Sequence, residues 1–253
     1  MIDLGLGPQG PLLAFVLFCR IGGCLMLMPG YSSTRVPVQV RLYLAMAITL
    51  MLAPMLAEPL KAAVPDVTPD RLVMLIVTET IIGGLIGLMG RIFFLALQFM
   101  ATAAANFIGL SGIGGPGIEE PEATPTFGVL ITLTATLLFF LTDQHWEVLR
   151  ALIASYRVLP VAEPVSAEFS VVKLTEAASS AFLLALQITS PFLVYTLIAN
   201  LLVGIANRLV PQVPVYWVSG PLVVFGGLIV LYFSIGETMR LFMAGFMAWL
   251  ARG

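Results

Sequence analysis

Residues 72–118 read LVMLIVTETIIGGLIGLMGRIFFLALQFMATAAANFIGLSGIGGPGI, and Glu79 and Arg91 are the only charged side chains in this stretch. One helix needs ~20 residues to cross ~30 Å of hydrocarbon, so this apolar run is longer than a single span. Further apolar runs cover residues 10–28, 42–57, 127–141, 174–206 and 213–250. This repetition is typical of a chain that enters a bilayer several times.

The composition supports the same class of protein. The chain has 253 residues, of which 59% are hydrophobic and 10% are charged, and its mean hydropathy is +1.02. A single soluble core cannot bury that much apolar surface, so membrane lipid is an expected partner. The net charge of −2 and the lack of a basic cluster exclude nucleic acid, whose phosphates require Lys and Arg.

The fold class follows from the lipid environment. Backbone donors inside a membrane must be satisfied within the chain, and the alternation of a β-barrel is absent here, so we predict an all-α, polytopic protein. The run at 42–57 is shorter than a span, whereas the run at 213–250 is longer than one. Run lengths therefore predict about five to seven helices, some of which do not span.

Small residues recur inside the longest run. The segment IGGLIGLMG (82–90) places Gly83 and Gly87 four residues apart, on one face of a helix. Small residues at this spacing let two helix backbones approach closely, so we predict helix packing at these glycines.

Three ionisable residues stand within apolar runs: Arg20, Glu79 and Arg91. Such a side chain costs ~2.5–3.5 kcal/mol at the centre of a membrane helix, and it normally faces a partner or water. Glu79 and Arg91 lie about 18 Å apart along one helix, so their partners must come from other helices or other chains. Packing or subunit contact is one interpretation, and a helix end or snorkelling side chain is the other. Glu237 and Arg240 have the spacing of a local helix pair.

A Gly-rich segment interrupts the apolar sequence after residue 110. Glycine and proline disfavour helix propagation, so the sequence predicts an irregular loop there. Its function is either that of a mobile plug or gate or that of an ordinary turn. The candidate gate residues are Ser111, Gly112, Ile113, Gly114, Gly115, Pro116, Gly117 and Ile118.

No catalytic, metal or cofactor motif is apparent. The sequence lacks the common nucleophile, zinc and phosphate-loop patterns, so we predict neither an enzyme nor a bound cofactor. Cys19 and Cys24 suit core packing rather than a disulfide or a metal site. The lone His145, followed by Trp146, is expected in an interfacial loop.

Four segments together resemble the FliR family, the flagellar type III export-gate subunits related to the SctT/SpaR subunits of virulence injectisomes. They are FIGL (107–110), FFLTDQH (139–145), RVLP (157–160) and ANLLVGIANRLVPQ (199–212). The specific part of the likeness is Asn207-Arg208 followed by Pro211-Gln212. The resemblance covers nearly the whole chain in the length and order of its apolar runs.

The resemblance implies a subunit of long, partly broken helical hairpins within a hetero-oligomeric gate. It would join FliP-like and FliQ-like subunits, contact an FlhB-like protein and pass unfolded flagellar proteins through the bacterial inner membrane at the flagellar basal body. Much of its apolar surface would then face neighbouring subunits rather than lipid, which would explain run lengths that fit a bilayer poorly.

The resemblance also implies an organisation and roles for residues. Residues 1–253 would form one domain, with N-terminal hairpins over 1–110, a plug loop over 111–126 and C-terminal hairpins over 127–253. Ile113 and Ile118 would be the apolar members of the plug. Asn207, Arg208, Pro211 and Gln212 would lie at a break between two helices, where the first two bind carbonyls or a neighbour's carboxylate.

Alternative functions are left open by the sequence. The host machine could be an injectisome rather than a flagellum. A small secondary transporter would use Arg20, Glu79 and Arg91 to bind an ion or solute near the midplane, but such proteins often show internal repeats that we do not find here. An intramembrane enzyme would lack a nucleophile and base.

Overall fold

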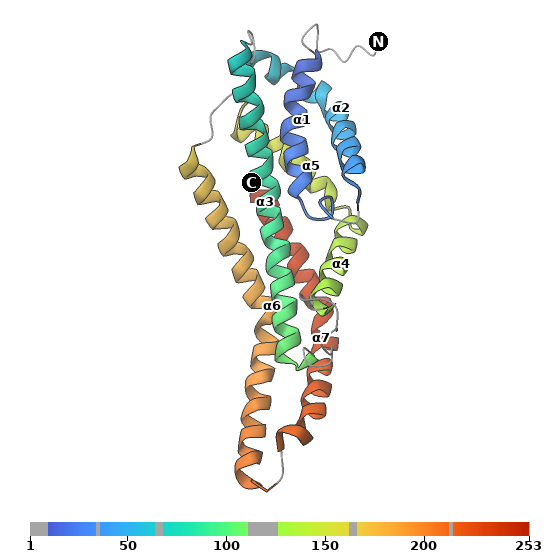
Figure 1. The fold of residues 1–253 in the computed structure, drawn as a ribbon, viewed down its shortest axis with the longest axis vertical. Coiled ribbons are helices and arrows are strands. Elements are labelled where there is room, and N and C mark those ends of the chain that lie inside the picture. Colours follow the sequence, from blue (N-terminus) through green and yellow to red (C-terminus); the bar gives the residue numbers. More distant parts are fainter. Residues whose placement is uncertain are drawn as a thin grey trace. The chain divides into compact units, whose positions relative to one another are not determined.

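The fold is a set of long α-helices (Figure 1). The computed structural model describes residues 10–33, 36–63, 68–110, 126–161, 166–212 and 215–252. Within these ranges it contains no strand, which confirms the all-α class. The helices are α1 (Gly10–Leu27), α2 (Val38–Ala63), α3 (Pro69–Phe107), α4 (Thr126–Leu141), α5 (His145–Val158), α6 (Ala167–Leu209) and α7 (Val215–Arg252).

Most of these helices are suited to a membrane. In the described ranges, five helices are long and apolar enough to cross one, namely α1, α2, α3, α6 and α7. The pair formed by α4 and α5 would make a sixth span, although it is bent by 74°. The polytopic class is therefore confirmed, and the count lies in the expected range.

Three helices are much longer than a bilayer requires. α3 has 39 residues, α6 has 43 and α7 has 38. At 1.5 Å per residue each extends over ~57–65 Å, about twice the thickness of the hydrocarbon. Pro191 within α6 and Pro221 within α7 each remove one backbone donor from these long helices. A large part of each helix must therefore lie outside the hydrocarbon layer.

The chain divides into two compact units, and each draws on both halves of the sequence. The first unit contains Met1–Phe93, Thr142–Ser179 and Trp249–Gly253, and the second contains Phe94–Leu141 and Ser180–Ala248. The division into hairpins around residues 111–126 stays a prediction.

The first unit is built on α1, which packs against α2. The buried side chains of α1 include Leu13, Val16, Leu17 and Ile21, which recur at three- and four-residue steps. This spacing places them along one stripe of the helix, so α1 forms the core of its unit.

Aromatic side chains hold the second unit together. The ring of Phe94 on α3 meets Phe242 and Phe246 of α7 edge-on, at centroid distances of 5.2 and 5.7 Å. Phe139 of α4 joins the same cluster, 6.2 Å from Phe246. Edge-to-face packing of this kind adds ~0.5–1.5 kcal/mol per pair to the burial of the rings, so the cluster fixes α3, α4 and α7 within this unit.

The expectation of an interfacial loop around His145 is wrong, because His145 begins α5. The turn before it uses Asp143, whose φ of 57° lies in the left-handed region that Asp tolerates. α5 buries Val148, Leu152 and Tyr156 at four-residue intervals, while Arg150 and Arg157 face outward. α5 contains too many polar residues to form a continuous apolar run, so the apolar runs of the sequence do not include it.

Candidate functional site

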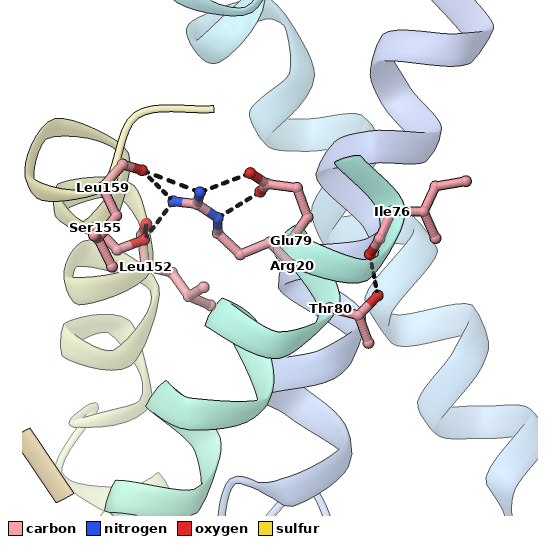
Figure 2. A network of polar contacts seen from close by, with 7 residues as sticks. All are labelled: Arg20, Ile76, Glu79, Thr80, Leu152, Ser155 and Leu159. Atoms are coloured by element: carbon pink, nitrogen blue, oxygen red, sulfur yellow. Dashed lines mark hydrogen bonds and ion pairs between the residues drawn. The ribbon is translucent and has the colours of Figure 1, made fainter. Parts of the chain in front are cut away.

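A buried ion pair joins α1 to α3 in the first unit (Figure 2). Arg20 Nε donates to Glu79 Oε2 at 2.6 Å, and Arg20 Nη2 donates to Glu79 Oε1 at 2.8 Å. Both side chains are 0% exposed. The planar guanidinium thus meets both carboxylate oxygens, the geometry in which Arg and Glu pair most strongly.

The remaining donors of Arg20 reach the C-terminal end of α5. Nη1 and Nη2 each donate to the carbonyl oxygen of Leu159 at 3.0 Å, and Nη1 also contacts Ser155 Oγ at 3.3 Å. Figure 2 shows the guanidinium between Glu79 on one side and Leu159 with Ser155 on the other. Its Cζ atom also lies 4.0 Å from the centre of the Tyr156 ring. A cation is favoured there by both the helix dipole and the aromatic face.

The arrangement acts as a clamp between three helices. Arg20 on α1, Glu79 on α3 and the last turn of α5 satisfy one another, so both charges are compensated inside the unit. An ion pair saturated in this way has no open position for a solute. The geometry therefore favours a structural role for Arg20 and Glu79 over ion or solute binding.

Sequence reasoning missed the α5 members of this clamp. Ser155 and Tyr156 are ordinary polar residues, and Leu159 contributes only its backbone carbonyl. The segment RVLP (157–160) includes Leu159, but in the sequence it indicated only a likeness to a family and not a contact with Arg20.

Arg91 behaves differently from Arg20 although both interrupt apolar sequence. Its side chain is exposed, and no ion pair joins it to another residue of the described ranges. It therefore does not join the Arg20–Glu79 clamp. Glu237 and Arg240 form the local pair expected from their spacing, at 3.9 Å.

Gly83 and Gly87 lie where α3 meets α1. A Cβ atom added to Gly83 would overlap the carbonyl oxygen of Arg20, and one added to Gly87 would overlap the carbonyl oxygen of Cys24. Gly23 of α1 is also close to α3, since its added Cβ would lie 2.8 Å from the carbonyl oxygen of Thr80. These glycines let the two backbones come close enough for Arg20 to reach Glu79.

Asn207 and Arg208 lie in the last turn of α6, and Pro211 and Gln212 follow before α7 begins. All four side chains are exposed. Neither Asn207 nor Arg208 makes a side-chain hydrogen bond to another described residue of the chain. A contact with a neighbouring subunit stays a prediction for this motif.

The candidate plug residues, Ser111 to Ile118, lie outside the described residues, but the backbone that leads into them is firmly held in the second unit. Thr196 Oγ1 of α6 donates to the carbonyl oxygen of Phe107 at 2.7 Å. Ile108 is fully buried and packs against Gly227 of α7. Gly109 then adopts a φ of 79° and donates to the carbonyl oxygen of Asn106 at 3.1 Å. Together these contacts end α3 at Phe107 and hold the backbone as far as Gly109.

Replacing Gly109 with Ala is expected to lower the stability of the folded chain by ~1–2 kcal/mol, because a left-handed backbone is strained for any residue with a Cβ. The new Cβ would also lie 3.2 Å from Val224 Cγ2. The measurement is the thermal midpoint of the detergent-purified protein. Gly236→Ala is the control, since nothing lies within 4 Å of its added Cβ. Equal midpoints for the two variants would contradict the strained turn.

Within the described parts of the chain, no group of three or more His, Cys, Asp or Glu side chains could hold a metal ion. Cys19 and Cys24 are free thiols.

The chain is similar to known bacterial export proteins. The model of bacterial export proteins, family 1, matches residues 12–248. The flagellar biosynthetic protein FliR of Caulobacter vibrioides is 28% identical over 229 residues, which cover 88% of this chain and 88% of the relative. The Escherichia coli FliR protein is 29% identical over 205 residues, covering 79% and 75%. The Yop proteins translocation protein T of Yersinia pestis is 28% identical over 220 residues, covering 85% and 82%.

These matches extend over nearly all the helices described above. They confirm the likeness to the FliR family that the four sequence segments indicated, and they include both flagellar and Yop translocation proteins. The chain belongs to the bacterial export proteins, family 1.

Proposed function

We propose that this chain is the FliR-type subunit of a flagellar type III protein export gate. With FliP-like and FliQ-like subunits it would form the channel through which unfolded flagellar proteins cross the inner membrane, beside an FlhB-like protein in the basal body. The observation that carries the proposal is the family match over residues 12–248. No catalytic step and no cofactor is needed for this function.

The surface of the second unit supports a place inside an assembly. α6 and α7 expose large apolar side chains along their lengths, and Trp217 at 86% and Phe233 at 77% are among the most exposed. Both helices are about twice as long as the hydrocarbon is thick. Lipid can cover only part of such a surface, so neighbouring subunits are the natural cover for the rest.

The test is to purify the tagged chain from its native host in a mild detergent and to measure the mass and composition of what co-elutes. We expect one large complex that contains FliP-like and FliQ-like subunits. A stable monomer or homodimer without them would contradict the proposal.

An injectisome is the second candidate host machine, because the Yop translocation protein T matches at an identity similar to that of the flagellar relatives. The same purification separates the two. Recovery of flagellar partner subunits would support the flagellar gate. Recovery of injectisome partner subunits would show instead that the host machine is an injectisome.

The resemblance further suggests that residues 111–118 close the resting channel. Deleting residues 112–117 is expected to make the assembled complex leak ions, because a channel without its plug leaves a hydrated path. The measurement is ion flux into proteoliposomes that contain the purified complex. Native mass must first show that the variant complex has the wild-type composition. A complex of normal composition that stays tight would count against the plug.

A further inference from the structure

One face of α3 in the first unit carries a regular row of exposed apolar side chains. Met74, Val77, Ile81 and Leu88 are all exposed, and Arg91 continues the row. Their spacing alternates between three and four residues once position 84 is included, which is the heptad pattern of a helix–helix seam. We call residues 74, 77, 81, 84, 88 and 91 the α3 seam.

Position 84 of the seam is a glycine. A Cβ added to Gly84 would meet only the Leu27 Cδ1 atom, at 3.8 Å, which is ordinary van der Waals contact. Gly84 thus differs from Gly83 and Gly87, whose faces are filled by α1. Position 84 therefore adds no side chain to the seam between Ile81 and Leu88.

Arg91 places a positive charge on the apolar α3 seam, and this charge needs a counter-charge. Exposed apolar side chains flank it on both sides along the helix, with Leu88 before it and Leu95 and Phe99, at 50% and 65% exposed, after it. If Arg91 lay at the lipid headgroups, one of these apolar flanks would lie outside the hydrocarbon and would need a protein cover. If lipid tails surrounded it, the guanidinium would have no counter-charge. An apolar surface with an anionic group at this one level would satisfy both apolar flanks and the charge together.

The chain itself contains an example of such a surface. At Arg20, an apolar stretch of α3 presents one carboxylate, Glu79, which pairs with the guanidinium through both oxygens while both side chains are fully buried. A helix with the same chemistry, supplied by another subunit, would bury Arg91 in an equivalent way.

We propose that the α3 seam is the docking face for an apolar membrane helix of a neighbouring subunit that carries an Asp or Glu opposite Arg91. This inference rests on the proposed function, because it requires a neighbouring membrane subunit. Heptad spacing on the seam fits a partner helix that crosses α3 at a shallow angle, and the carboxylate sets its register.

The partner helix can be identified by photo-crosslinking in the intact complex. A photoreactive amino acid placed at Leu88 is expected to crosslink to an apolar segment of another subunit that contains an Asp or Glu. The same amino acid placed at Trp146, which is exposed on α5, is the control for general reactivity. Crosslinks from Leu88 to lipid alone would overturn the proposal.

A charge exchange then tests the pairing. Arg91→Glu is expected to reduce recovery of the partner subunit at least several-fold, and replacement of the partner's carboxylate with Arg is expected to restore it. Arg71→Glu, at an exposed position in the first turn of α3, is the matched control and should leave recovery unchanged. Arg91→Lys keeps the positive charge at this position and should therefore retain most of the partner.

The outcomes separate this inference from the proposed function. If the wild-type complex contains FliP-like and FliQ-like subunits but Arg91→Glu recovers them at the wild-type level, the docking face is wrong and the proposed function stands. If the wild-type chain recovers no partner subunit, the proposed function fails and the docking face fails with it.

Discussion

Glu79→Gln is expected to destabilise the first unit by about 3–5 kcal/mol, because it leaves the Arg20 guanidinium buried without its counter-charge. Both side chains are 0% exposed, so water cannot replace the lost carboxylate in the folded state. A loss of this size corresponds to a fall of roughly 6–20 °C in the thermal midpoint of a protein of this length. The midpoint of the detergent-purified chain, followed by size-exclusion chromatography, measures it.

The matched control is Glu147→Gln, the same chemical change in an exposed ion pair of the same unit. Glu147 and Arg150 are 37% and 73% exposed, so this pair should contribute less than about 1 kcal/mol. The double variant Arg20→Leu with Glu79→Leu removes both charges at once, and we expect it to be more stable than either single variant. Additive losses from the two single changes would show that the clamp does not act as a unit.

Hydropathy alone predicted much of the fold. The apolar runs found in the sequence correspond to α1, α2, α3, α4, α6 and α7, because burial in lipid or in apolar protein requires continuous apolar sequence. α5 was missed because only one stripe of it is buried, through residues such as Leu152 and Tyr156, while Arg150 and Arg157 face outward. A helix that covers other helices rather than spanning lipid is detectable by its 3.6-residue period and not by its mean hydropathy.

The candidate site could be predicted only in part. The cost of burying a charge identified Arg20, Glu79 and Arg91 and required partners from other helices or chains. It could not identify the partner, because Arg20 and Glu79 are 59 positions apart in the sequence and are brought together by the packing of α1 on α3 rather than by any local pattern. The same argument applied equally to Arg91, which the structure leaves exposed. The free-energy cost of a charge within an apolar run shows that the charge needs a partner. Only the register of the helices shows whether this chain supplies that partner.

That register depends on the glycines between α1 and α3. Gly83 lies against the carbonyl oxygen of Arg20 itself, so the close approach of the two backbones and the position of the guanidinium are set at one place. Side-chain volume at position 83 and the ion pair are therefore coupled properties. A change in either one should alter the other.

Gly83→Val is accordingly expected to destabilise the first unit by at least about 3 kcal/mol, the upper end of the usual cost of overpacking a core. The cost is high because the new Cβ would overlap a backbone atom that cannot move aside. The displaced α1 should also weaken the Arg20–Glu79 pair, so Gly83→Val and Glu79→Gln together should cost less than the sum of the two. The thermal midpoints of both single variants and of the double variant provide the measurement.

Gly204→Val is the control, since nothing lies within 4 Å of a Cβ added there and α6 should tolerate the change within about 0.5 kcal/mol. The comparison keeps the chemical change and the helical setting constant and varies only the presence of a neighbouring backbone. If Gly83→Val and Gly204→Val had the same midpoint, α1 and α3 would not be in contact at these glycines. The clamp between Arg20 and Glu79 would then need another source of register.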